Sequence, residues 1–184
     1  MRRLRSRFAA RNQLRNLGVG LGIAAAAFWF TPTRAANESR QAEVTQRGAQ
    51  VMPFALKSTV HLFTKTPDGG VQRVVVRDAA DAEQIKLIRQ HLREMQARFE
   101  QGDFSGPSYI HGDEMPGLAA LKAAKPGAIS YLYRDVDAGA EIAYQAKDAT
   151  LIDALHAWFD AQISDHGPDA MQGQEHDHGQ RSMR

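Results

Sequence analysis

Cysteine is absent from this chain of 184 residues. Its absence excludes disulfide bonds, thiolate metal ligands, a thiol nucleophile, a lipoprotein anchor and covalent attachment of c-type haem. Catalytic motifs are missing as well, because the chain contains no GxSxG, GxxxxGK[ST], HExxH or GxGxxG pattern. Its acidic residues form no recognisable pair in an apolar setting. These absences favour a binding role over an enzymatic reaction.

Acidic residues are also absent from the first 35 positions, where seven arginines occur. Leu17–Phe30 is an uncharged, apolar run of 14 residues, and small residues surround Ala35. This pattern predicts a secretory signal peptide over residues 1–35, cleaved after Ala35. An uncleaved membrane anchor is the alternative, but a spanning helix needs about 20 apolar residues. We therefore expect a periplasmic protein with no stable membrane anchor after cleavage.

Removal of the signal peptide would reverse the sign of the net charge. The whole chain carries 23 basic and 21 acidic residues, a net charge of +2, and 16 of the basic residues lie beyond position 35. The mature chain would therefore carry a net charge of −5. An acidic chain without a basic stripe is a poor candidate for nucleic-acid binding.

The mature chain is expected to consist of a leader, one domain and a tail. Residues 36–50 are polar and have no apolar period, which predicts a flexible leader. Residues 51–167 are long enough for a single domain with its own core. Residues 168–184 are polar and rich in glycine, which predicts a disordered tail containing His176 and His178.

Within residues 51–167, a β-hairpin followed by a helix is predicted twice. The first unit has strands over residues 58–65 and 71–77 and a helix capped by Asp78; the second has strands over 128–134 and 140–147 and a helix capped by Asp148. Residues 103–114 are expected to form a loop. Two consecutive hairpins predict an α+β fold with a four-stranded antiparallel sheet and helices on one face. A ferredoxin-like βαββαβ order is the alternative.

Both predicted helices carry an apolar stripe at helical spacing. In the first helix the stripe is Ile85, Ile88, Leu92, Met95 and Phe99; in the second it is Leu151, Ile152, Leu155, Trp158, Phe159 and Ile163. Each helix is therefore expected to bury one face against the sheet.

Seven histidines lie beyond the predicted signal peptide. Without thiols, the available protein ligands for a metal are imidazole, carboxylate and the methionine thioether. Such a set suits copper best, with zinc or nickel as alternatives. The predicted ligands are His91, His111, Met115, His156 and His166.

These candidates differ in what supports them. His111 and Met115 lie within five residues of one predicted loop, while His91 and His156 flank the apolar stripes of the two similar units. Each of them also has an ordinary explanation, as a polar loop residue or a core histidine. His166 ends the last helix, where a protonated imidazole would favourably cap the helix dipole. His61 is uninformative, because either face of its strand is a candidate for the inner one.

Five segments of the chain carry a family resemblance: Val51-Met52-Pro53-Phe54, Ile110-His111-Gly112, Met115-Pro116-Gly117-Leu118, the run from Ala154 to Gln162, and Asp165-His166-Gly167. Over residues 51–170 the chain resembles a family of small exported proteobacterial proteins of unknown function. Some members are labelled aspartate carbamoyltransferase, but the Ser-Thr-Arg-Thr phosphate loop of that enzyme is absent from this chain. The resemblance implies a shared fold and export, and it assigns no catalytic residue.

These observations lead to three functional hypotheses. The first is a periplasmic protein that binds or handles a transition metal, with copper favoured. The second is a periplasmic module that binds a small ligand or another protein without a metal. The third is a transferase, as the aspartate carbamoyltransferase label implies.

Overall fold

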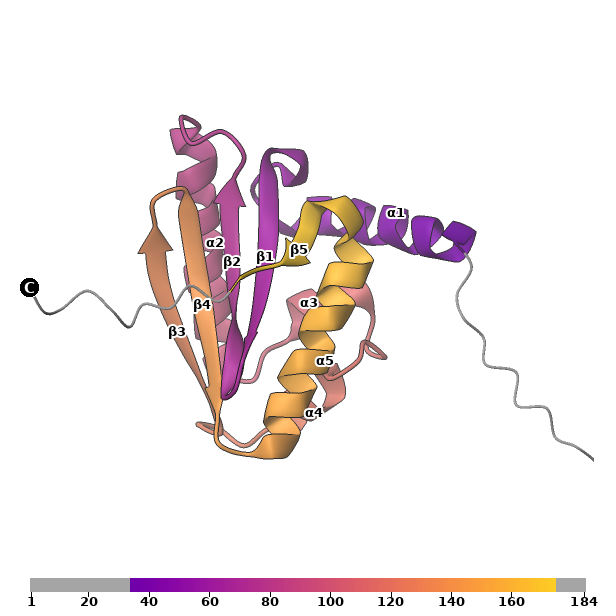
Figure 1. The fold of residues 1–184 in the computed structure, drawn as a ribbon, viewed down its shortest axis with the longest axis vertical. Coiled ribbons are helices and arrows are strands. Elements are labelled where there is room, and N and C mark those ends of the chain that lie inside the picture. The colour runs from indigo at the N-terminus through magenta and orange to yellow at the C-terminus, as the bar shows by residue number, and fades with distance from the viewer. Residues whose placement is uncertain (1–33, 175–184) are drawn as a thin grey trace, which may run out of the picture. The chain divides into compact units, whose positions relative to one another are not determined.

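The computed structural model describes residues 34–174, which form an α+β fold (Figure 1). The elements are α1 (Arg34–Val51), η1 (Leu56–Ser58), β1 (Thr59–Thr66), β2 (Gly69–Val76), α2 (Ala82–Glu100), α3 (Ser105–His111), α4 (Leu118–Ala123), β3 (Ile129–Val136), β4 (Gly139–Ala146), α5 (Ala149–His166), η2 (Gly167–Asp169) and β5 (Ala170–Gln172). The predicted signal peptide lies outside the described residues except for Arg34 and Ala35. His176 and His178 lie outside them too. No helix within residues 34–174 is long and apolar enough to cross a membrane.

The sheet has five strands in the order β3-β4-β2-β1-β5. Both predicted hairpins are present, and β2 pairs with β4 in antiparallel orientation. The prediction of a purely antiparallel, four-stranded sheet was wrong, because β5 adds to β1 in parallel. Gly167, with a φ of 55°, turns the chain after α5 so that residues 170–172 reach β1. Residues 170–172 of the expected disordered tail are therefore part of the sheet.

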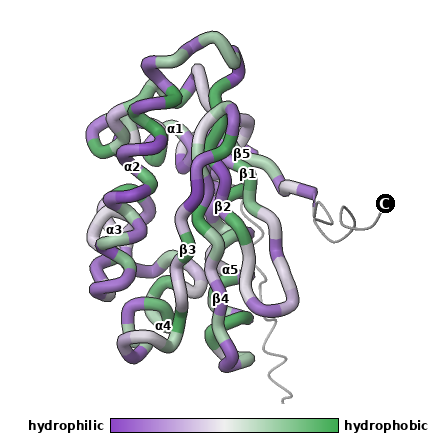
Figure 2. Tube along the Cα trace, turned by 90° about the vertical axis from the view of Figure 1, so that its left-hand side faces the viewer, coloured by the Kyte–Doolittle hydropathy of each residue, from purple (hydrophilic) through white to green (hydrophobic). Residues whose placement is uncertain are grey.

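The helices lie on one face of the sheet, as predicted. Viewed from the β3 edge in Figure 2, α2, α3 and α4 lie on one side of the strands. Trp158 and Phe159 of α5 pack against Phe63 and Tyr144 on that same side. On the opposite side Leu132 is 55% exposed. This one-sided arrangement follows from the alternating pattern of the strands.

The predicted capping residue is correct for α5 and wrong for α2. Asp148 caps α5 by accepting a hydrogen bond from the Thr150 backbone N–H at 2.8 Å. The cap of α2 is Asp81, which accepts from the backbone N–H of Gln84 at 3.1 Å. Asp78 instead accepts from the N–H of Ala80 and closes a local turn before the helix. Asp accepts such short-range bonds in turns as readily as in caps.

The expected flexible leader is helical. Residues 34–51 form α1, which packs against α3 and α5. Its apolar contribution is small, since Val44 and Gly48 are its buried residues. Polar side chains of α1 hold the helix in place instead: Arg40 binds Asp165, and Gln41 donates a hydrogen bond to the carbonyl of Ser164. Contacts made through arginine and glutamine leave no apolar period in the sequence.

Two glycines allow backbones to approach closely. A Cβ at Gly139 would lie 2.1 Å from the carbonyl oxygen of Val74, where the two hairpins meet. Gly117, with a φ of 79°, is the N-cap residue of α4, and a Cβ there would lie 2.1 Å from the carbonyl oxygen of Ala154 in α5. Both positions require glycine because the neighbouring backbone is so close. Gly117 also requires it because its positive φ is unfavourable for other residues.

Candidate ligand pocket

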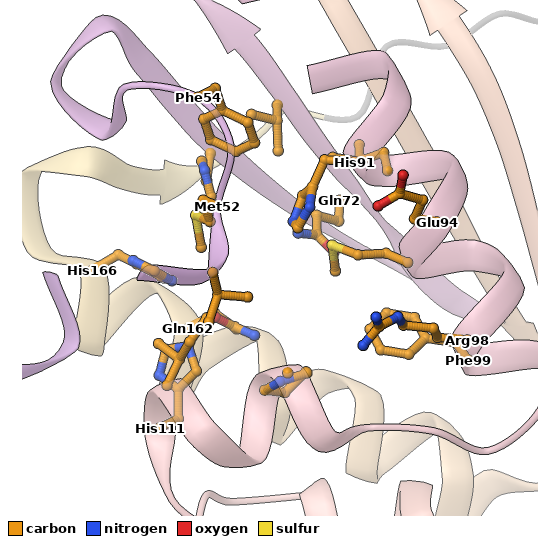
Figure 3. Close-up of a pocket in the computed structure, with 18 of the residues that line it drawn as sticks. Met52, Phe54, Gln72, His91, Glu94, Arg98, Phe99, His111, Gln162 and His166 are labelled. Atoms are coloured by element: carbon orange, nitrogen blue, oxygen red, sulfur yellow. The ribbon is translucent and has the colours of Figure 1, made fainter. Parts of the chain in front are cut away.

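A cavity of about 130 Å³ lies between the sheet and the helices (Figure 3). It is lined by parts of β1, β2, α2, α3 and α5 and by the segment that follows α1. Figure 3 shows His111, Gln162 and His166 on one side of the cavity, and His91, Glu94 and Arg98 on the other. Glu94 and Arg98 are exposed, whereas His111, Gln162 and His166 are buried. The cavity therefore has a polar mouth beside α2 and an inner wall rich in imidazole.

Three imidazoles from separate elements form that inner wall, and we call them the imidazole cluster: His61 of β1, His111 of α3 and His166 of α5. Each residue is no more than 5% exposed. The ring centroids of His61 and His166 are 5.2 Å apart, and those of His111 and His166 are 5.0 Å apart. The fold therefore brings together residues separated by 50 positions or more.

A carboxylate fixes the orientation of one of these rings. His111 Nδ1 lies 2.8 Å from Asp165 Oδ2. Arg40 donates two hydrogen bonds to the same carboxylate, one of 3.1 Å from Nε and one of 2.7 Å from a terminal nitrogen. Burial alone would raise the pKa of Asp165, but the hydrogen bonds from His111 and Arg40 outweigh it and lower that pKa to about 2.

The ionised carboxylate determines the tautomer of His111. A carboxylate that has lost its proton only accepts hydrogen bonds, so Nδ1 of His111 must carry the hydrogen. In the neutral ring, Nε2 then bears a free lone pair. No described residue forms a hydrogen bond with this Nε2. The arrangement therefore presents a hydrogen-bond acceptor, or a metal ligand, at the imidazole cluster.

Burial holds the rings of His61 and His166 in their neutral forms. Burial, followed by the proximity of His91 and His111, lowers the pKa of His61 to about 4. Burial, followed by His61 and His111, lowers the pKa of His166 well below 6.5 although Asp165 opposes this. The expected protonated helix cap at His166 was therefore wrong, because the ring is buried among other imidazoles.

One polar atom in this wall has no partner. Among the described residues, the buried side-chain atoms without a hydrogen bond are Nε2 of His61 and Nε1 of Trp158. Of these two residues, His61 lines the pocket. A buried, unpaired polar atom is costly, and in native proteins it calls for a specific explanation. A bound molecule that pairs with His61 Nε2 would supply one.

The opposite wall belongs to α2. His91 is partly buried, with its ring 5.5 Å from that of Phe54, which also contacts His61 at 5.9 Å. Burial is the main cause that lowers the pKa of His91 to about 4, although Glu94 opposes it. Phe54 therefore contacts both His91 and one member of the imidazole cluster.

The structure brings together part of the predicted metal-ligand set. His91, His111 and His166 line the pocket, but His156 and Met115 do not. His156 Nε2 lies 3.0 Å from the carbonyl oxygen of Thr66 and 2.8 Å from that of Gly69, so it braces the first hairpin. Met115 is packed into the hydrophobic core. As they stand, no three histidine, aspartate or glutamate side chains within residues 34–174 are placed to hold a metal ion.

Three residues of the site were missed by the sequence analysis: His61, Arg40 and Asp165. His61 faces inward, on the same face of β1 as the buried residues Thr59 and Phe63. His111, expected on a loop, ends helix α3, so it does not curl around an ion with Met115. The sequence does not show which face of β1 points toward the core, and this was the information missing for His61.

Four of the five segments quoted for the family resemblance lie at this pocket. Residues 51–54, 110–112 and 154–162 supply lining residues, the last of these through Gln162, and residues 165–167 supply Asp165 and His166.

Comparison with known proteins gives no further assignment: no family model, no curated protein and no solved structure matches the chain.

Proposed function

We propose that this chain is an exported protein whose pocket binds a small, uncharged molecule about the size of one aromatic ring. The observation that carries the proposal is the unpaired Nε2 of His61 in the buried wall of a cavity. An enclosed apolar pocket with a few convergent polar groups is the usual form of a small-molecule site. The cavity volume of about 130 Å³ is close to the ~150 Å³ that accommodates benzene in other proteins.

The chemistry of the wall specifies the ligand class. Phe54, Leu92 and Phe99 supply apolar surface, and the imidazole cluster supplies hydrogen-bonding atoms. The buried charge of Asp165 is already compensated by Arg40. A charged ligand would lose its hydration at the inner wall without meeting an opposite free charge. An aromatic or heteroaromatic ring with one hydrogen-bonding group suits this wall best.

Small-molecule binding can be tested with four one-ring probes: phenol, imidazole, benzene and benzoate. We expect phenol and imidazole to bind at one equivalent and to shift the ring NMR signals of the imidazole cluster, because both form hydrogen bonds. At ten times its dissociation constant, such a probe should raise the free energy of unfolding by about 1.4 kcal/mol. Benzoate should bind more weakly than phenol, since its charge is not paired.

A pair of methionine substitutions supplies the control. Met95→Trp would fill the pocket from α2, whereas Met171→Trp would place the same ring on an exposed position of β5. We expect the first to abolish phenol binding and the second to leave it unchanged. Equal binding by both variants would place the probe elsewhere and refute the proposal.

Export is proposed on the basis of the basic and apolar segments in residues 1–35. We expect N-terminal sequencing of protein from the soluble periplasmic fraction to begin at Ala36. This position lies two residues after the start of α1, so cleavage there would preserve Arg40 and nearly all of the helix. Recovery of chains with an intact Met1 in the membrane fraction would contradict this expectation.

A further inference from the structure

The hydrogen-bonding role of one atom in the imidazole cluster is fixed. Arg40 donates two hydrogen bonds to the carboxylate of Asp165, which stays ionised because its pKa is lowered to about 2. An ionised carboxylate only accepts hydrogen bonds, so His111 donates to it through Nδ1, and Nε2 of the neutral ring is left as an acceptor. A molecule that pairs with His111 in the pocket must therefore bring a hydrogen-bond donor.

The same wall also holds groups that can donate. Gln162 and His166 are four positions apart on α5, so they share one helix face, and both line the cavity. Neither side chain forms a hydrogen bond with another described residue. The amide of Gln162 carries two hydrogens, and the neutral rings of His61 and His166 carry one each. We call Gln162, His61 and His166 the wall donors, and their buried N–H groups call for a hydrogen-bond acceptor.

The acceptor and the donors lie beside one another. The ring centroids of His111 and His166 are 5.0 Å apart, and Figure 3 shows Gln162 on the same side of the cavity as both. A phenol hydroxyl presents its donor and its acceptor on a single oxygen, whereas these side chains come from three elements, β1, α3 and α5. A cyclic amide places the two functions on neighbouring atoms, with an N–H next to a carbonyl, and it carries no charge. Its flat faces would pack against apolar side chains such as Leu92 and Phe99.

We propose that the ligand of this pocket is a planar cyclic amide, whose ring N–H donates to Nε2 of His111 and whose carbonyl oxygen accepts from the wall donors. The carbonyl oxygen has two lone pairs, so it can pair with more than one of them. Binding would give a partner to Nε2 of His61, which is buried without one. This inference rests on the proposed function and names the ligand class of the same site.

The test is a titration of the full chain with three rings of similar size: α-pyridone, α-pyrone and benzene. α-Pyridone is a cyclic amide, and α-pyrone has the same ring and carbonyl but an oxygen in place of the N–H. We expect α-pyridone to bind roughly 10–100-fold more tightly than α-pyrone, because the latter leaves Nε2 of His111 buried without a donor. NMR of the unaltered chain should independently find the ring hydrogen of His111 on Nδ1, and Nε2 should respond to added α-pyridone.

Two substitutions in the wall separate the two halves of the amide. His111→Phe removes the acceptor and should abolish the preference for α-pyridone over α-pyrone. Gln162→Leu removes a donor of similar size and should lower the affinity for α-pyridone about 10-fold while leaving that for benzene unchanged. Circular dichroism of each variant would establish that it is folded.

His156→Gln is the matched control, because it changes a histidine outside the pocket and should keep the full preference for α-pyridone. The inference is overturned if the unaltered chain binds α-pyridone and α-pyrone equally, or if Nε2 of His111 carries the hydrogen. In either case, binding of phenol or benzene in the pocket would leave the proposed function standing. Failure of every ring to bind, benzene included, would refute the proposed function and this inference with it.

Discussion

Acidification from pH 7 to pH 4 should lower the free energy of unfolding by about 3 kcal/mol or more. The pKa of His61 falls from its ordinary value of 6.5 to about 4 in the folded state because of burial, and that of His91 falls to about 4 for the same main reason. Burial also lowers the pKa of His166. Each pKa unit corresponds to about 1.4 kcal/mol, so His61 alone accounts for about 3 kcal/mol.

The direction follows from proton binding. These groups are bases with a lower pKa in the folded chain, so the unfolded chain binds more protons between pH 6.5 and about 4. Their full contribution to stability is present above pH 6.5 and is lost as the pH falls through about 4. Asp165 acts in a separate window, because its pKa of about 2 keeps its contribution intact above its ordinary value of 3.8.

Denaturant unfolding at a series of pH values would measure this effect. His61→Phe should reduce the slope of stability against pH by about 1.4 kcal/mol per pH unit within the window, because one proton fewer is taken up. Leu132→Ala is the control: it alters an exposed side chain on the opposite face of the sheet that does not titrate, so any loss of stability should be equal at pH 8 and pH 5. An unaltered slope for His61→Phe would contradict the burial of a neutral ring.

Phe159→Ala should lower the free energy of unfolding by about 3–5 kcal/mol. The Phe159 side chain is fully buried, and its ring centroid lies 5.1 Å from that of Phe63 and 5.5 Å from that of Tyr144. The ring also packs closely against Gly70, where an added Cβ would come within 2.5 Å of it. Such a closely enclosed site cannot collapse easily around the missing ring, so the cavity cost should be near its upper range.

Leu132→Ala provides the comparison for this core substitution. Leu132 lies on β3 with 55% of its surface exposed, and we expect its truncation to change stability by no more than about 0.5 kcal/mol. Chemical denaturation of both variants at one pH checks the pair. Similar midpoints for Phe159→Ala and the unaltered chain would show that α5 presents a different face to the sheet.

Most of the sheet and both long helices could be predicted because their patterns are local. Turn residues mark the hairpins, and the stripe that includes Leu155 and Phe159 identifies the buried face of α5. Helix α1 could not be predicted in this way, because its contacts run through Arg40 and Gln41 to residues more than 120 positions away. Strand β5 was missed for a related reason: three residues gain their structure from an edge supplied by β1.

The candidate site was harder to predict than the fold. Histidines on α2, α3 and α5 were identified as a class, but their partners depend on how distant elements are juxtaposed. His156 follows an apolar position of its helix just as a pocket residue would, yet backbone carbonyls of the first hairpin bind it. His61 carried no sequence signal, since strand alternation defines two faces without telling which one is covered.

The position of Arg40 has a practical consequence for recombinant fragments. The composition of residues 36–50 suggests starting a minimal domain at Val51, and all the main sheet strands would then be retained. Such a fragment would lack the guanidinium that binds Asp165, and this half-buried carboxylate would depend on His111 alone. Binding measured on such a fragment would describe an altered pocket. Fragments made for ligand and metal studies should therefore begin at or before Ala36.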